Sequence, residues 1–181
     1  MPILLEEEVE ETGLVLPKLQ FVPLRLRTKL SPKETVTGNR YDFVLVCQPD
    51  ALDNYALYDR IQELVEDRKR LRIYCPHNDL AVKKELSDVI SFTVKEAIPR
   101  TRGVLVHLTT VTPEIQEMFD ATYLNNRPFL LFYAEETEPF NQANATNIRN
   151  HPCYMGECVY FNEEHAIRLL DEAIDVALCV G

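Results

Sequence analysis

Residues 43–47 read Phe43-Val44-Leu45-Val46-Cys47, and Pro49 and Asp50 close the run. A continuous apolar run of this length, ended by turn residues, is typical of a strand that is covered on both of its faces. Such strands occur mainly in parallel sheets flanked by helices. This first regular segment of the chain therefore predicts an α/β protein.

The rest of the chain alternates between strand and helix patterns. The predicted strands are short apolar runs, which lie at 43–47, 71–75, 104–108, 129–133 and 158–161. The predicted helices carry apolar residues three or four positions apart, and they lie at 52–69, 80–98, from Thr112 onward and after Asn162. This alternation predicts a five-stranded, mostly parallel sheet in a three-layer sandwich of the flavodoxin-like or Rossmann-like type.

The first 40 residues differ from the remainder. They begin with a run rich in glutamate and continue with apolar pairs that Pro17 and Pro23 interrupt, a spacing that excludes helix and suits an extended segment or edge strand. We therefore predict an N-terminal extended arm over 1–40 and a single α/β domain over 41–181. The arm is expected to pack on the domain or on another subunit. Because such an arm suits contacts between subunits, we expect a homo-oligomer.

Composition narrows the possible partners and the location. The formal net charge is -10, so binding to a nucleic-acid backbone is disfavoured. The one basic run, Arg68 to Arg72, is interpreted as cations at a helix C-terminus. No apolar run approaches the roughly 20 residues that span a bilayer. Five cysteines without a CxxC pair fit a reducing compartment, so we expect a cytoplasmic protein without membrane contact.

Several familiar chemistries are excluded by missing motifs. The chain has only five glycines, and none of them forms a dinucleotide-binding or phosphate-binding loop. There is no GxSxG elbow for a serine nucleophile and no HExxH metal motif. His151, Cys153 and Cys158 are too weak a group to indicate zinc. We therefore predict neither a metal nor an organic cofactor.

Carboxylates are the best candidates for chemistry. Ligands of open parallel sheets bind beyond the carboxyl ends of the strands, which places the site after residues 47, 75, 108 and 133. Asp50 and Asp53 follow the first strand, and Glu114 and Glu117 lie one turn apart at the start of the helix that Thr112 caps and Pro113 begins. A carboxylate near a helix N-terminus is stabilised in its ionised form. Solvated acids at a helix start are the simpler interpretation of these residues.

Three further side chains lie near the same edge. Tyr55 and Tyr58 are placed to stack on a ligand or close a pocket, and His77 follows the second strand directly. A histidine in a polar turn is the simpler interpretation of His77. His107 lies within the third predicted strand, 104–108, and its side chain is expected to lie in the core.

Two stretches resemble the nucleoside 2-deoxyribosyltransferase superfamily, including its deoxynucleotide N-hydrolase members. They are the helix at 56–64 and the segment 117–129, with Glu117, Ala121 and the turn Asn126-Arg127-Pro128 before a strand. TIR-type NAD-cleaving domains are similar in architecture. The resemblance implies that Glu117 is a nucleophile or holds sugar hydroxyls, and that Asp50 or Asp53 binds the base or acts as a general acid. The implied ligand is a nucleoside or nucleotide.

Two hypotheses remain open. The first is an enzyme that cleaves or transfers an N-glycosidic bond, with Glu117 as its catalytic residue. The second is a non-catalytic module that senses a ligand or binds a protein. The low glycine count favours the second, as does Phe119, which stands where the family has a glycine.

Overall fold

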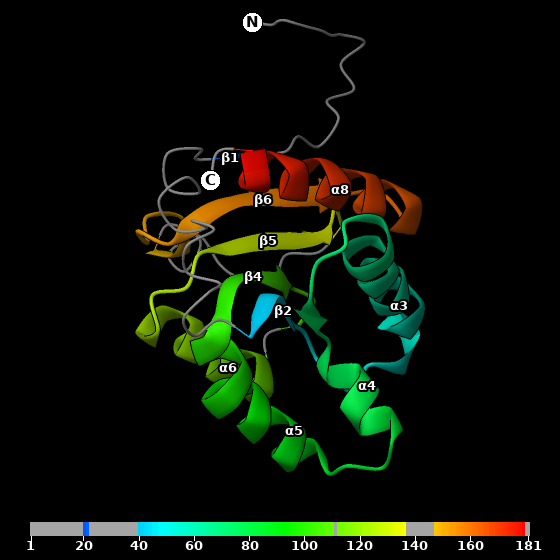
Figure 1. The fold of residues 1–181 in the computed structure, drawn as a ribbon, viewed down its shortest axis with the longest axis vertical. Coiled ribbons are helices and arrows are strands. Elements are labelled where there is room, and N and C mark those ends of the chain that lie inside the picture. Colours follow the sequence, from blue (N-terminus) through cyan, green and yellow to red (C-terminus); the bar gives the residue numbers. More distant parts are fainter. Residues whose placement is uncertain (1–19, 22–39, 111, 137–146, 180–181) are drawn as a thin grey trace, which may run out of the picture.

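The computed structural model describes residues 20–21, 40–110, 112–136 and 147–179. Within these residues the sheet has six strands in the order β1-β6-β5-β4-β2-β3 (Figure 1). The strands β2 to β6 pair in parallel, and only β1 is antiparallel to its neighbour. Numbered along the chain, the parallel strands follow the order 2-1-3-4-5, which is the flavodoxin-like arrangement. The predicted fold class is confirmed.

The strands lie close to the predicted runs. Their bounds are Tyr41–Val46 for β2, Ile73–Tyr74 for β3, Thr101–His107 for β4, Phe129–Ala134 for β5 and Tyr154–Tyr160 for β6. The last strand begins four residues earlier than the apolar run indicated, because it includes a glycine and a buried glutamate. The two-residue β1, Gln20–Phe21, pairs with β6 at the sheet edge. This agrees with the prediction that the arm forms an extended segment or an edge strand. Residues 1–19 and 22–39 of the predicted arm lie outside the described residues.

The helices connect these strands. Their bounds are Tyr55–Glu63 for α3, Pro76–Ala81 for α4, Leu86–Phe92 for α5, Pro113–Leu124 for α6 and Glu163–Cys179 for α8. The single helix predicted over 80–98 is confirmed from Leu86 onward, where α5 continues into the π-helix Thr93–Ala97, but its start is wrong, because α4 ends at Ala81 and the chain turns before α5. Lys83 has a φ of 70° between them, a left-handed conformation that a continuing helix does not allow.

The helices cover the two faces of the sheet as separate layers. Side chains of α3 and α8 form one core cluster with Leu45 and Phe132, whereas α5 and α6 form another with Val46 and Leu131. Successive residues of β2 therefore enter opposite cores, which is why its sequence is apolar without alternation. The three-layer sandwich follows from this double burial.

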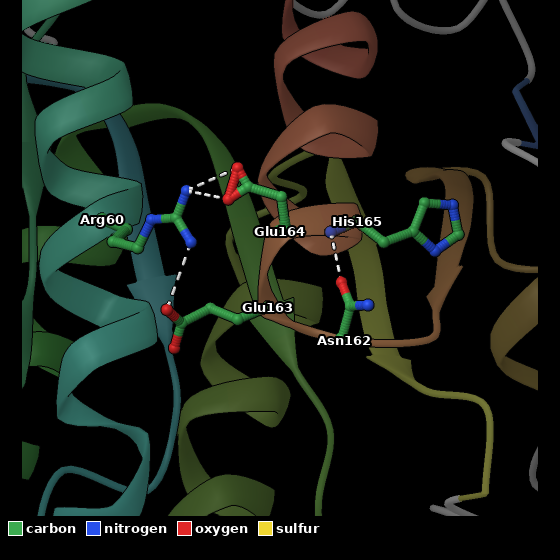
Figure 2. Close-up of polar contacts among 5 residues, drawn as sticks. All are labelled: Arg60, Asn162, Glu163, Glu164 and His165. Atoms are coloured by element: carbon green, nitrogen blue, oxygen red, sulfur yellow. Dashed lines mark hydrogen bonds and ion pairs between the residues drawn. The ribbon is translucent and has the colours of Figure 1, made fainter.

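Salt bridges join the two helices on the first face. Arg60 of α3 donates to Glu163 and Glu164 at the start of α8, as Figure 2 shows. Further along, Lys69 binds Asp171 and Asp175. The sequence indicated that the basic run at 68–72 is a set of cations at a helix C-terminus. Its side chains also pair with acids that are distant in sequence: Arg68 with Asp171, and Arg72 with Asp42. These pairs leave less positive charge for an anionic partner.

A bulge in β6 places a glutamate in the second core. Leu130 pairs with Gly156 although Phe129 pairs with Tyr154, so the strand gains a residue, and Gly156 has a φ of 141° that favours glycine. The shift brings Glu157 to the face of Tyr154. The Glu157 carboxylate is buried, accepts hydrogen bonds from Tyr133 and Tyr154, and pairs with Arg149 through both oxygens.

We predict that Glu157→Gln lowers the free energy of unfolding by about 2 kcal/mol, because it breaks an ion pair whose acid is buried and whose arginine is half exposed. Burial raises the pKa of Glu157, but Arg149 and the two phenols outweigh it and hold the pKa below its ordinary value of 4.5. The ion pair therefore stabilises the fold above about pH 4.5 and loses this effect as the pH falls further. Urea unfolding between pH 3 and 7 measures both effects, and the exposed Glu135→Gln is the control. Equal stability of the Glu157 and Glu135 variants at pH 7 would contradict the prediction.

The start of α8 is sensitive to histidine protonation. Asn162 accepts a hydrogen bond from the His165 backbone (Figure 2). The His165 Nδ1 accepts one from the Phe161 backbone at 3.0 Å. Nδ1 must be unprotonated to accept. Burial and the nearby Arg168 lower the pKa of His165 from its ordinary value of 6.5.

We predict that the wild type loses stability relative to His165→Gln as the pH drops below about 6.5. The folded state binds the His165 proton less readily than the unfolded state, so acid favours unfolding, whereas glutamine keeps an acceptor and does not titrate. Thermal unfolding at pH 5.5 and 7.5 measures the difference. A constant difference between the two proteins at both pH values would disprove the role of His165.

Candidate functional site

The site lies where the strand order reverses. The central neighbours β2 and β4 are parallel, but β2 leads to α3 on one face and β4 leads to α6 on the other. The two connections therefore separate beyond the strand ends, and open α/β sheets bind ligands in the crevice between them. The sequence predicted this location from the turn after Cys47 and the helix that starts at Thr112.

The connection after β2 is held by its own hydrogen bonds. The Ala51 amide donates to the Gln48 carbonyl at 3.2 Å, and the Tyr55 hydroxyl donates to the Pro49 carbonyl at 2.7 Å. Cys47 is fully buried below it. Burial raises the pKa of this thiol well above its ordinary value, so Cys47 is not a reactive thiolate. These two hydrogen bonds hold the backbone of the turn between Gln48 and Tyr55.

Gln48 spans the crevice. Its Nε2 donates to an Asp50 carboxylate oxygen at 2.6 Å and lies 3.5 Å from the Glu114 Oε1, and its Oε1 accepts from the Thr112 hydroxyl. One carboxamide therefore joins the turn after β2 to the start of α6. Gln48 was not among the predicted site residues, although it stands directly after the first predicted strand.

The start of α6 was predicted correctly. Thr112 caps the helix by accepting from the Ile115 amide at 3.1 Å, and Pro113 occupies the first turn. Glu114 is partly buried in that turn, close to the positive end of the helix dipole. The structure thus brings Asp50 and Glu114 to the same crevice, as their positions in the sequence indicated.

Glu117 lies in a neighbouring groove and not between Asp50 and Asp53. It is exposed and, with Glu114, lines a groove of about 320 Å³ between α5 and α6. The lining residues from α5 are Leu86, Ser87, Ile90 and Ser91. Glu114 is shared by the groove and the crevice. Asp53 is exposed in the short turn Leu52–Asn54, and no hydrogen bond joins Asp53 or Glu117 to another described side chain.

The aromatic residues predicted near the site have other roles. Tyr58 has no exposed surface, and its hydroxyl hydrogen bonds to His107 Nδ1 at 2.8 Å, so it cannot stack on a ligand. His77 is buried at the start of α4 and not in a polar turn, with its Nε2 2.8 Å from the Asp59 carboxylate. The Tyr55 ring lies edge-on to His77. Only Tyr55 remains at the rim, where it supports the turn.

His107 links three elements in the first core. Its Nδ1 contacts the Tyr58 hydroxyl and its Nε2 contacts the Tyr160 hydroxyl at 2.7 Å, while its ring stacks on Phe132. Burial lowers the pKa of His107 to about 4, so the ring is neutral at pH 7, with one nitrogen donating and the other accepting. The prediction that His107 lies in the core is confirmed.

The charge of the crevice and groove is acidic. The six side chains around the groove include no lysine or arginine. Several basic side chains pair with carboxylates elsewhere: Arg60, Arg68, Lys69, Arg72, Arg102 and Arg149. Within the described residues, no group of three or more His, Cys, Asp or Glu side chains is arranged to hold a metal ion. The site therefore suits a neutral or cationic ligand better than a phosphate.

Phe119 does not fill the groove. It is buried in the second core, where its ring contacts Phe129 edge-on with centroids 5.3 Å apart. The bulky residue that stands where the resembled family has a glycine therefore leaves the groove beside Glu117 open.

Comparison with known proteins does not assign the chain to a family. No family model matches the chain, and a search of curated proteins finds no significant match. In the part of the chain that is described, no helix combines the length and the apolar character needed to cross a membrane. The fold and site define the class of protein: a flavodoxin-like α/β protein with an acidic crevice at the strand-order reversal.

We predict that Tyr58→Phe lowers the free energy of unfolding by about 1–2 kcal/mol, because it leaves a buried nitrogen of His107 without its partner. Chemical unfolding in urea measures the change. The control is Tyr41→Phe, since the Tyr41 hydroxyl makes no hydrogen bond with the described residues. A Tyr58→Phe variant as stable as this control would show that the buried hydrogen bond does not stabilise the fold.

Proposed function

We propose that the protein binds an unphosphorylated nucleoside-like ligand at the crevice and groove and cleaves its N-glycosidic bond. The observation that supports this function is the acidic rim: Asp50, Glu114 and Glu117 border the adjoining crevice and groove where the strand order reverses. Carboxylates accept hydrogen bonds from sugar hydroxyls and stabilise the positive charge that develops on the sugar. The groove side chains of Leu86 and Ile90 offer apolar contact for the ring of a sugar or base.

Glu117 is the residue we assign to the chemistry. In the first step its carboxylate forms a bond to the anomeric carbon while the bond to the base breaks, and the electron pair leaves with the base. The departing base takes a proton from a general acid, for which Asp50 or Asp53 is the candidate. The same residue, now a carboxylate, takes a proton from water as the water oxygen bonds to the anomeric carbon, and the bond to Glu117 breaks to regenerate its free carboxylate. Tyr58 and His77 have no part in these steps, because both are buried.

A non-catalytic role is the alternative, and one observation favours it. Glu117 is exposed, and no described side chain orients its carboxylate. Catalytic groups are normally held in place by packing and by hydrogen bonds from neighbouring residues. Under this alternative, the crevice senses a ligand or binds a protein, and the N-terminal arm supplies contacts between subunits.

Light scattering of the full chain tests whether the protein forms the expected homo-oligomer.

We expect the wild type to release free base from nucleosides and not from their 5′-monophosphates or NAD, because a phosphate would meet the acidic rim. Glu117→Gln should reduce the rate of release by about 100-fold or more. Chromatography of the free base, together with release of nicotinamide from NAD, measures the reaction.

Asp120→Asn is the matched control, because Asp120 is an exposed carboxylate on the same helix outside the groove. This variant should keep the wild-type rate. Release that survives Glu117→Gln would remove Glu117 from the chemistry. No release by the wild type from any of these compounds would favour the non-catalytic alternative.

A further inference from the structure

Arginines stand at the starts of three neighbouring strands. Arg40, Arg72 and Arg100 directly precede β2, β3 and β4 respectively, and Arg70 lies just before Arg72. Because these strands are parallel neighbours, their starts lie along one edge of the sheet, about 4.8 Å apart. The Arg40 amide donates to the Arg100 carbonyl at 2.7 Å, so these two positions are adjacent. All four side chains are exposed, and together they form what we call the basic edge.

One buried carboxylate serves two arginines at this edge. Asp42 accepts a hydrogen bond from Arg102 Nη1 at 3.0 Å, and its other oxygen lies 3.4 Å from Arg72 Nε. A single negative charge therefore faces two guanidinium groups. The Arg72 side chain is half exposed and keeps donors that can face solvent.

The other arginines of the basic edge are balanced even less. Arg100 has one weak ion pair, with Glu96 at 3.8 Å, and both side chains are about half exposed. Arg40 and Arg70 form no ion pair with the described residues. Like charges on adjacent strands repel each other, so an anionic partner at this edge would stabilise the arrangement.

The backbone of Arg70 indicates that its side chain matters more than its conformation. Arg70 has a φ of 58°, a left-handed value that favours glycine or asparagine. An arginine at such a position brings no conformational advantage. It adds an exposed positive charge beside a strand start that already carries others.

The chain itself contains a segment of opposite charge. Residues 6–11 read Glu6-Glu7-Glu8-Val9-Glu10-Glu11, and no lysine or arginine precedes Lys18. This acidic run lies outside the described residues. Guanidinium groups bind carboxylates through strong, charge-assisted hydrogen bonds, so the run and the basic edge are complementary. A nucleic acid fits less well, because the net charge of -10 opposes its approach.

The direction of β1 favours an edge on another copy. Gln20 pairs with Glu157 and Phe21 with Gly156, so the chain enters β1 from the side of the strand ends. The strand β1 is also separated from β2 by three strands. To reach the basic edge of its own copy, the acidic run would have to cross those strands and turn to their starts.

We propose that the acidic run of one copy binds the basic edge of a second copy, so that two chains associate through complementary charges. This surface lies at the strand starts, whereas the crevice lies beyond the strand ends, so the inference does not depend on the proposed function. It identifies the surface that the N-terminal arm contacts in the expected homo-oligomer.

Salt gives the first test. Sedimentation velocity of the full chain should show a dimer at about 0.05 M NaCl that dissociates at about 0.5 M, because the screening length falls about threefold over this range. A chain that stays monomeric at low salt up to sub-millimolar concentrations would overturn the inference. So would a dimer that is indifferent to salt.

Two variants separate the contact surfaces. The edge variant carries Arg40→Gln, Arg70→Asn and Arg100→Gln, since asparagine tolerates a positive φ. The run variant has glutamine at all five glutamates of the acidic run. Each variant alone should dimerise at least about 10-fold more weakly than the wild type at low salt. Dimerisation that neither variant weakens would overturn the inference.

A triple variant elsewhere gives the matched control, with Lys83→Asn, Lys84→Gln and Arg168→Gln. Lys83 shares the positive φ of Arg70. Lys84, like Arg100, has one weak ion pair, at 3.9 Å. Arg168 is exposed on α8. This control loses the same charge as the edge variant, and it should dimerise like the wild type. A loss as large as that of the edge variant would reduce the effect to net charge and overturn the inference.

Mixing the edge variant with the run variant tests contact between copies. The edge variant keeps the acidic run and the run variant keeps the basic edge, so a 1:1 mixture should associate more tightly than either variant alone. No association in the mixture, with a wild type that dimerises, would overturn the inference.

A labelled peptide of residues 1–13 guards against misfolding of a variant. It should bind the full-length run variant, whose basic edge is intact, and a peptide with glutamine at the five glutamates should not. Equal binding of both peptides would contradict the inference. A wild type that stays monomeric and instead binds single-stranded DNA through the same arginines would assign the basic edge to nucleic acid and overturn the inference.

Discussion

The parallel pairing of β2 with β4 is the constraint on which the rest of the structure depends. Val44 pairs with Val104 and Val46 pairs with Val106, and none of these side chains has exposed surface. Burying each of them contributes about 1.5–3 kcal/mol. The chain passes from β2 to β3 on one side of this pair and from β4 to β5 on the other, so crossovers of the same hand place the following helices, α3 and α6, in different layers. The crevice is a consequence of that packing, and it would exist whatever residues bordered it.

Much of the fold could be predicted because strands that are buried on both faces appear in the sequence as continuous apolar runs. Residues 43–47 and 104–108 carry no alternation, and turn residues end them, so strand type and sheet type followed together. The break between α4 and α5 could not be predicted in the same way. It depends on the backbone of Lys83, a residue type with no preference for the left-handed conformation it adopts. The bulge at Gly156 could not be predicted from the sequence either, since a glycine within a strand fits several local geometries.

The positions of the candidate site residues could be predicted only in part. Asp50 and Glu114 follow strand ends that the topology brings together, so sequence position was a sufficient guide. Tyr58 and His77 were misplaced because their polar groups suggested contact with solvent. Tyr58 is satisfied in the interior by His107, and the buried His77 bonds through Nε2 to the exposed Asp59 while its Nδ1 has no partner among the described residues. Such contacts between distant elements cannot be recognised in a single sequence.

The contrast between two acidic regions argues that the crevice is more than solvated surface. Between α3 and α8, four acidic residues meet arginine or lysine, so the charge there is balanced within the fold. At the crevice, the described partner of Asp50 and Glu114 is a neutral carboxamide. Nearby like charges that the fold leaves unneutralised cost stability, and proteins retain such local conflicts chiefly at functional sites. A ligand that carries hydrogen-bond donors would relieve this conflict more fully than the single carboxamide of Gln48 does, and this argument for ligand binding does not depend on Glu117.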